Sequence, residues 1–164
     1  MINSERQWLS GIDWQKVVEV NQEICQKEGV CFKERKGFEK ARQLWEANKE
    51  KTTKLVNALD FLKKISQIEP FELFNNNTMA TIARMIIEPY TGTASKLLKQ
   101  MLLSTASHYV VGLAKRRELI EVIDYFDYAE GNGQFNATKE KDAKRPEPAR
   151  NSAGQSEPAG MPLR

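Results

Sequence analysis

Histidine and cysteine are scarce in this sequence, and their scarcity limits the chemistry that it supports. The 164 residues contain one histidine, His108, and two cysteines, Cys25 and Cys31. No Glu-x-x-His or His-x-x-x-His spacing occurs, although zinc and di-iron sites on helices are typically built from such pairs. We therefore predict a protein without a metal, a cofactor or an enzymatic activity, in which His108 is a partly buried, neutral core residue.

Signals for secretion and membrane insertion are missing as well. The residues before Trp14 mix charged and apolar side chains and do not form a charged-then-apolar leader. The uncharged run at residues 101–114 is shorter than the roughly 20 residues that a bilayer span needs. Two cysteines are also few for the disulfide framework of an oxidising compartment, which favours free thiols. These features predict a cytoplasmic protein that has no membrane partner.

Apolar residues recur at three- and four-residue steps along most of the chain, which indicates an all-α fold. Residues 97–114 are apolar nearly all round a helical wheel, and such a helix is normally buried, so we predict a central helix there. Between Phe38 and Ile68 the spacing continues until Pro70, which predicts a long second helix. The polar residues 48–53 in its middle are equally compatible with a solvated bend. The pattern as a whole predicts a single bundle of about five helices.

Several residues mark where these helices begin and end. Asp13 is a suitable N-cap for the first helix, and Gly29 ends it. Pro89 ends a shorter helix near residue 88. The apolar stripe changes phase near residues 115–117, so we predict a kink or a separate last helix that ends near Gly131. The inward face of this last helix comprises Leu119, Ile120, Ile123 and Phe126.

The two ends of the chain differ in composition. Trp8 and Leu9 give the N-terminal residues two apolar anchors, which predicts a latch against the bundle. From Asn132 onward, proline, glycine, serine and alternating charges replace large apolar residues. Such a segment buries too little apolar surface to offset the entropy of ordering. We therefore predict a helical domain at residues 1–131 and a disordered polar tail at residues 132–164.

Charge is distributed unevenly around the start of the last helix. Residues 79–117 contain one acidic and six basic residues, whereas residues 118–130 contain five acidic residues and no basic one. Clustered bases can bind phosphate oxygens, and Tyr90 or Tyr109 would then stack on a base. The alternative is a solvated face that pairs with the acidic helix, whose Glu121, Asp124 and Asp127 share one side. The candidate residues for nucleic acid or an acidic partner are Arg84, Lys96, Lys99, Lys115, Arg116 and Arg117.

These features favour a protein that acts by binding. The first hypothesis is a non-enzymatic helical assembly or adaptor subunit of a larger complex, whose partner is another protein. The alternative is a small helical subunit of a nucleoprotein complex that makes nonspecific phosphate contacts to RNA or DNA through the basic patch.

Overall fold

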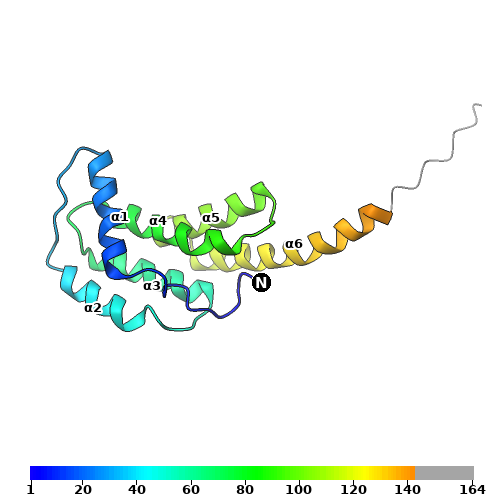
Figure 1. Cartoon of the computed structure of the whole chain (residues 1–164), viewed down its shortest axis with the longest axis horizontal. Coiled ribbons are helices and arrows are strands. Elements are labelled where there is room, and N and C mark those ends of the chain that lie inside the picture. The colour runs from blue at the N-terminus through cyan, green and yellow to red at the C-terminus, as the bar shows by residue number, and fades with distance from the viewer. Residues whose placement is uncertain (143–164) are drawn as a thin grey trace, which may run out of the picture.

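The protein is mostly helical, as the sequence predicts. The computed structural model describes residues 1–142, with side chains up to residue 132, and this part contains no β-strand. It has six α-helices, one more than the predicted number, and one short 3-10 helix (Figure 1). They are α1 (Trp14–Lys27), α2 (Phe38–Asn48), α3 (Leu55–Ile68), α4 (Asn75–Ile87), η1 (Glu88–Tyr90), α5 (Lys96–Val110) and α6 (Arg116–Asp142).

The two ends of α1 and the end of α4 lie where the sequence predicts them. The Asp13 side chain caps α1 by accepting a hydrogen bond of 2.9 Å from the Lys16 backbone N–H. Gly29 follows α1 with a φ of 68°, a conformation that glycine adopts without steric cost. Pro89 lies in η1, immediately after the end of α4. No described helix combines the length and the apolarity of a membrane span.

The prediction of one long helix between Phe38 and Ile68 is wrong. The polar stretch in its middle is a bend, and α3 returns alongside α2 (Figure 1). The cause is a contact with the N-terminal segment: Arg6 and Thr53 exchange two backbone hydrogen bonds, each of 2.9 Å. A helical Thr53 would direct these backbone groups along its own helix, so the pairing with Arg6 requires the break.

The predicted enclosure of residues 97–114 on all sides is also wrong. Only one face of α5 is buried, and Leu97 on its other side is 78% exposed. Leu113, in the turn after α5, is 77% exposed. The helix ends at Val110, and Gly112 follows with a φ of 84° in the turn to α6. Helix α4 packs against α1, α3 and α5, so α5 is not the single centre of the bundle. An apolar wheel shows which residues can be buried, but the neighbouring helices determine which of them are.

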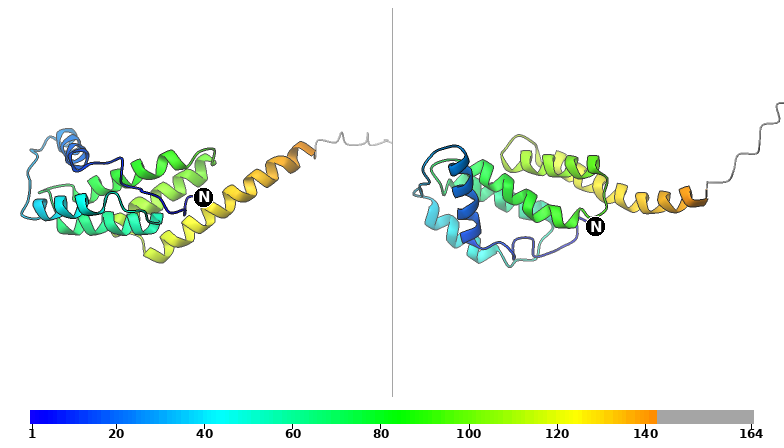
Figure 2. Two further views of the ribbon diagram at one scale, coloured as in Figure 1. Left: turned by 60° about the horizontal axis from the view of Figure 1, so that its bottom comes forward. Right: turned by 45° about the horizontal axis from the view of Figure 1, so that its top comes forward.

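Helix α6 is a separate helix, as the sequence predicts, and it is the longest in the molecule. The other five α-helices form the body of the molecule. Helix α6 runs along this body and then projects past the other helices (Figures 1 and 2). Its backbone continues to Asp142, beyond the predicted end near Gly131. Residues 132–142, predicted as the start of a disordered tail, are therefore helical, whereas residues 143–164 lie outside the described residues and their disorder stays a prediction.

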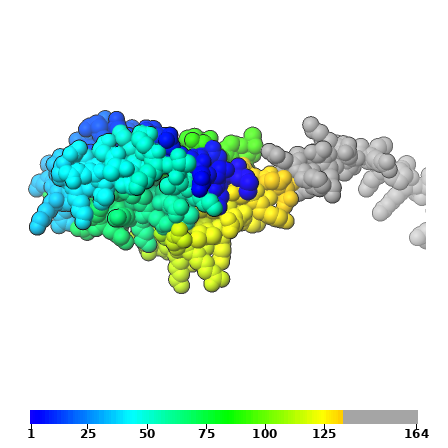
Figure 3. Space-filling view, turned by 90° about the horizontal axis from the view of Figure 1, so that it is seen from below, coloured from blue at the N-terminus to red at the C-terminus, as the bar shows by residue number. Residues whose placement is uncertain are grey.

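The N-terminal latch is present and is held by α6. Trp8 and Leu9 are both buried, and Ile2 is almost fully buried. Asp127, itself buried, accepts backbone hydrogen bonds from Ile2 at 2.5 Å and from Asn3 at 3.0 Å. The space-filling view shows the N-terminal residues lying against α6 (Figure 3). This carboxylate therefore joins the two ends of the described chain.

Replacing Asp127 by Ala is expected to release the latch, because two backbone N–H groups lose their acceptor at a cost of about 1–3 kcal/mol. Amide hydrogen exchange of the peptide that ends at Trp8 would measure the release, and the variant should exchange much faster than the parent. The matched control is Asp124→Ala, which removes an exposed carboxylate from the same helix. Equal protection in the parent and in Asp127→Ala would contradict this role.

Candidate functional site

The six candidate basic residues do not lie in one patch. Lys96 and Lys99 are in the first turn of α5, whereas Lys115, Arg116 and Arg117 follow its last residue. At 1.5 Å per residue, the length of α5 holds the two groups about 20 Å apart. Arg84, on α4, donates a hydrogen bond of 3.1 Å from Nε to the Ser107 hydroxyl. The sequence places these bases close together along the chain, but the helix between them separates them in space.

Arg116 is part of a cluster that joins three helices. Its guanidinium donates to both carboxylate oxygens of Asp60 on α3, at 3.1 and 3.2 Å. The Tyr109 hydroxyl on α5 donates to the same carboxylate. The ammonium of Lys63 lies 4.7 Å from the centre of the Tyr109 ring, a cation–π contact. Arg116 therefore connects α6 to α3 and α5, and Lys63 is a neighbouring base that the sequence pattern does not reveal.

Lys115 and Arg117 remain exposed at the junction between α5 and α6. Arg117 forms an ion pair of 3.0 Å with Glu121 one turn along α6, and such exposed pairs contribute only about 0–1 kcal/mol. The backbone N–H of Lys115 donates to the Glu118 carboxylate, but its ammonium has no ion pair within the described residues. This junction protrudes from one face of the body (Figure 3). Two of the three bases are thus accessible to a ligand.

Neither tyrosine expected to stack on a base offers a free ring. Tyr109 is buried, so the stacking role predicted for it is wrong. Tyr90 is half exposed, but the Arg6 guanidinium lies over its ring at 4.3 Å from the centre. The Trp8 ring also packs edge-on against Tyr90, with 5.0 Å between ring centres. Both tyrosines stabilise the fold, and any phosphate contact at the junction would depend on charge alone.

The hydroxyl of Tyr109 should give the protein a measurable pH dependence. Burial, and then the hydrogen bond to Asp60, raises the pKa of Tyr109 from its ordinary value of 10.0 to about 12. Because this folded-state pKa exceeds that of the unfolded chain, the contribution to stability is complete below about pH 10 and is lost as the pH rises towards about 12. Denaturant unfolding across this range should show a steeper loss for the parent than for Tyr109→Phe. Parallel curves would contradict the assignment.

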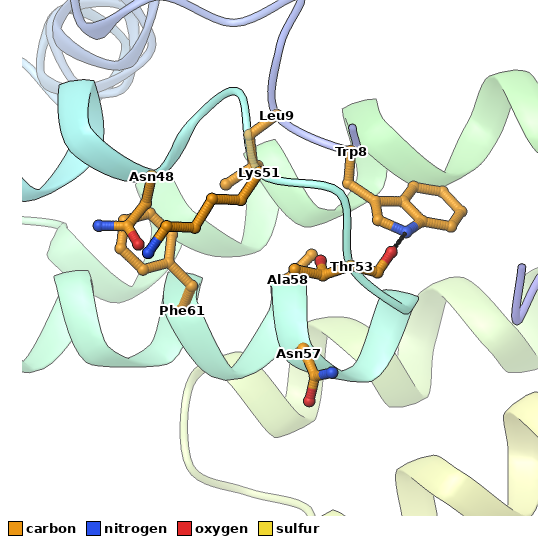
Figure 4. Close-up of a pocket in the computed structure, with 8 residues that line it drawn as sticks. All are labelled: Trp8, Leu9, Asn48, Lys51, Thr53, Asn57, Ala58 and Phe61. Carbon is orange, nitrogen blue, oxygen red and sulfur yellow. Dashed lines mark hydrogen bonds between the residues drawn. The ribbon is translucent and has the colours of Figure 1, made fainter. Parts of the chain in front are cut away.

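The single histidine and the small pocket beside Trp8 do not form a chemical site. His108 is exposed, so its prediction as a partly buried core residue is wrong; it lies towards the side of α5 that faces solvent. The described residues contain no group of three side chains that could hold a metal ion. A pocket of about 110 Å³ lies beside Trp8, Asn48, Lys51 and Phe61 (Figure 4). Because ligand pockets usually exceed about 300 Å³, this one has room for only a small group.

An exposed side of α6, next to the N-terminal residues, carries two aromatic residues. Tyr125 and Tyr128 are 55% and 69% exposed, and they are accompanied by the exposed carboxylates of Glu121 and Asp124. We call these four residues the outer face of α6. Positions 121, 125 and 128 have the same spacing as the buried core positions 119, 123 and 126, shifted by two residues. Two residues correspond to about 200° on a helix, so the outer face lies opposite the core face.

Comparison with protein-family models, curated proteins and solved structures finds no match for this chain. The surfaces described above are therefore what indicates the function of the protein. Of these, the outer face of α6 departs most from an ordinary solvated helix, because tyrosine rings present apolar area together with a hydrogen-bonding hydroxyl.

Proposed function

We propose that the protein is a non-enzymatic assembly subunit that binds a protein partner through the outer face of α6. The observation that carries the proposal is the exposure of Tyr125 and Tyr128 side by side on the face opposite the core. Tyrosine is enriched in protein interfaces and among the residues that dominate their binding energy. Asp124 beside them favours a partner surface of positive charge, and so does Glu121, whose exposed pair with Arg117 contributes only about 0–1 kcal/mol and can be exchanged. The free thiols of Cys25 and Cys31 support the cytoplasmic location that we propose with this function.

The way in which α6 is held also supports the proposal. Phe126, which lies between the two tyrosines in the sequence, is completely buried. This part of α6 is therefore packed against the body on the side opposite the tyrosines. The ion pair between Arg116 and Asp60 fixes the start of the helix. A face held rigid before binding loses less entropy when it binds. The helix also projects past its neighbours, which leaves a partner room to approach (Figure 2).

A photo-crosslinking amino acid at position 125 tests this function in the cells that produce the protein. We expect an adduct of discrete mass, and we expect it to disappear when Tyr128→Ala is combined with the probe. The same probe at position 19, an exposed site on α1, is the matched control and should give no discrete adduct. No adduct at position 125, or identical adducts at both positions, would contradict the proposal.

The accessible bases at the α5–α6 junction support a second candidate function, which is nonspecific contact with the phosphates of RNA or DNA. Lys115 has no acidic partner within the described residues, and Arg117 has only an exposed one. A salt titration of nucleic-acid binding should give a slope that falls by roughly two in Lys115→Ala/Arg117→Ala. Lys96→Ala/Lys99→Ala removes the same charge from the other end of α5 and should retain the parent slope. Equal slopes in all three proteins would exclude the junction as the phosphate-binding surface.

A further inference from the structure

A second charged surface lies where α2 begins and α3 ends. A groove of about 580 Å³ opens there, within the range of volumes that ligand-binding sites occupy. Its lining comprises Arg35, Lys36, Gly37, Lys40, Gln67, Ile68 and Glu69. We call it the basic groove.

The walls of the basic groove are held together by backbone contacts. A Cβ atom at Gly37 would lie 2.3 Å from the Ile68 carbonyl oxygen, so only glycine permits this approach of α2 to α3. The backbone N–H of Arg35 donates to the Pro70 carbonyl at 2.9 Å. The Arg35 side chain also forms an ion pair of 3.0 Å with Glu69 across the groove. The groove is therefore formed before any ligand arrives.

The charge of the groove favours an anionic occupant. Arg35 and Glu69 neutralise one another, whereas Lys36 and Lys40 are exposed and have no ion pair within the described residues. The half-buried Ile68 adds an apolar surface to the lining. An occupant that suits these groups carries carboxylates for the two ammonium groups and an apolar or aromatic surface for the rest.

We propose that the basic groove binds the outer face of α6 of a second copy of this chain. The inference rests on the proposed function, because it names the partner of that same face. Glu121 and Asp124 of one copy would pair with Lys36 and Lys40 of the next, and the two tyrosine rings would cover the lysine stems and Ile68. Charge complementarity of this kind gives both specificity and orientation to an interface.

The positions of the two surfaces determine what kind of assembly results. The basic groove lies at the end of the body where α2 begins, whereas α6 projects at the opposite end (Figure 1). Asp127 places the outer face of α6 near the N-terminus, which is also remote from the groove. The outer face of α6 in one copy therefore cannot reach the basic groove of the same copy. A contact between two different surfaces joins copies head to tail and produces a ring or an open series.

Sedimentation velocity of the full chain over a range of concentrations tests the inference. We expect the parent to form species larger than a monomer that dissociate when salt is raised. Lys36→Ala/Lys40→Ala and Tyr125→Ala/Tyr128→Ala should each raise the dissociation constant by about tenfold or more. Mixed together, these two variants retain one intact groove and one intact α6 face, so the mixture should form a dimer and nothing larger.

A matched control is Lys27→Ala/Lys54→Ala, which removes the same charge from exposed sites outside the groove and should associate like the parent. A parent that stays monomeric at low salt would overturn the inference, as would a groove variant that associates like the parent. A discrete crosslink from position 125 to a different protein would then leave the proposed function standing. Loss of both the crosslink and the self-association would remove the two proposals together.

Discussion

Replacement of Leu102 by Asp is expected to unfold the domain. Leu102 is completely buried on the side of α5 that packs against its neighbouring helices. An aspartate there would place an unpaired carboxylate in the core, at a cost of several kcal/mol. Domains of this size have a free energy of unfolding of only about 5–15 kcal/mol, so this cost would remove most of it. Circular dichroism should show loss of cooperative thermal unfolding, and size-exclusion chromatography should show an expanded or aggregated chain.

The matched control for this substitution lies on the same helix. Leu97 is 78% exposed, so Leu97→Asp introduces the same charge into water. Its melting temperature should stay close to that of the parent. A cooperatively folded Leu102→Asp variant would mean that α5 does not face the core, and the packing described here would be wrong.

Truncation of Trp45 to Ala is expected to cost about 3–5 kcal/mol, the range typical of large-to-small changes in a packed core. Trp45 is completely buried on α2 and packs against Trp14 and Phe61, with ring centres 6.1 and 5.7 Å away. Its indole N–H donates to the Ile12 carbonyl at 2.9 Å, which joins the start of α1 to α2. Urea unfolding monitored by circular dichroism should show a much lower midpoint.

A second variant separates the hydrogen bond from the packing. Trp45→Phe keeps most of the ring but leaves the Ile12 carbonyl without its donor, so we expect a smaller loss of about 1–3 kcal/mol. A Trp45→Ala variant within about 1 kcal/mol of the parent would contradict the burial of this residue between Trp14 and Phe61.

The sequence predicts those parts of the fold that depend on neighbouring residues. Asp13 and Gly29 bound the first helix because capping and left-handed backbone are local properties. The break between α2 and α3 depends instead on Arg6, which reaches Thr53 only in the folded chain. The exposure of Leu97 likewise depends on where other helices pack, and no periodicity within α5 contains that information.

In the candidate site too, some features follow from the local sequence and others depend on contacts between distant residues. Of the four predicted core residues of the last helix, Leu119, Ile123 and Phe126 are confirmed as buried, because their spacing places them on one face. Ile120 is only partly buried, because it lies about 100° round the helix from Leu119. Asp127 belongs to the same predicted acidic face as Glu121, yet its carboxylate binds the N-terminal backbone. That contact joins residues that are 125 positions apart in the sequence and has no counterpart in the local pattern. The outer face of α6 could be found from its spacing, once the core face is known.

Chemical labelling of the tyrosines tests most directly the claim that the outer face of α6 binds a protein. Nitration followed by mass spectrometry would compare the isolated, dilute chain with the assembly purified from cells. Tyr125 and Tyr128 should react readily in the dilute chain and be protected in the assembly. Tyr90, 43% exposed and outside the outer face, is the internal reference and should react equally in both. Equal labelling of Tyr125 and Tyr128 in the two samples would contradict the account.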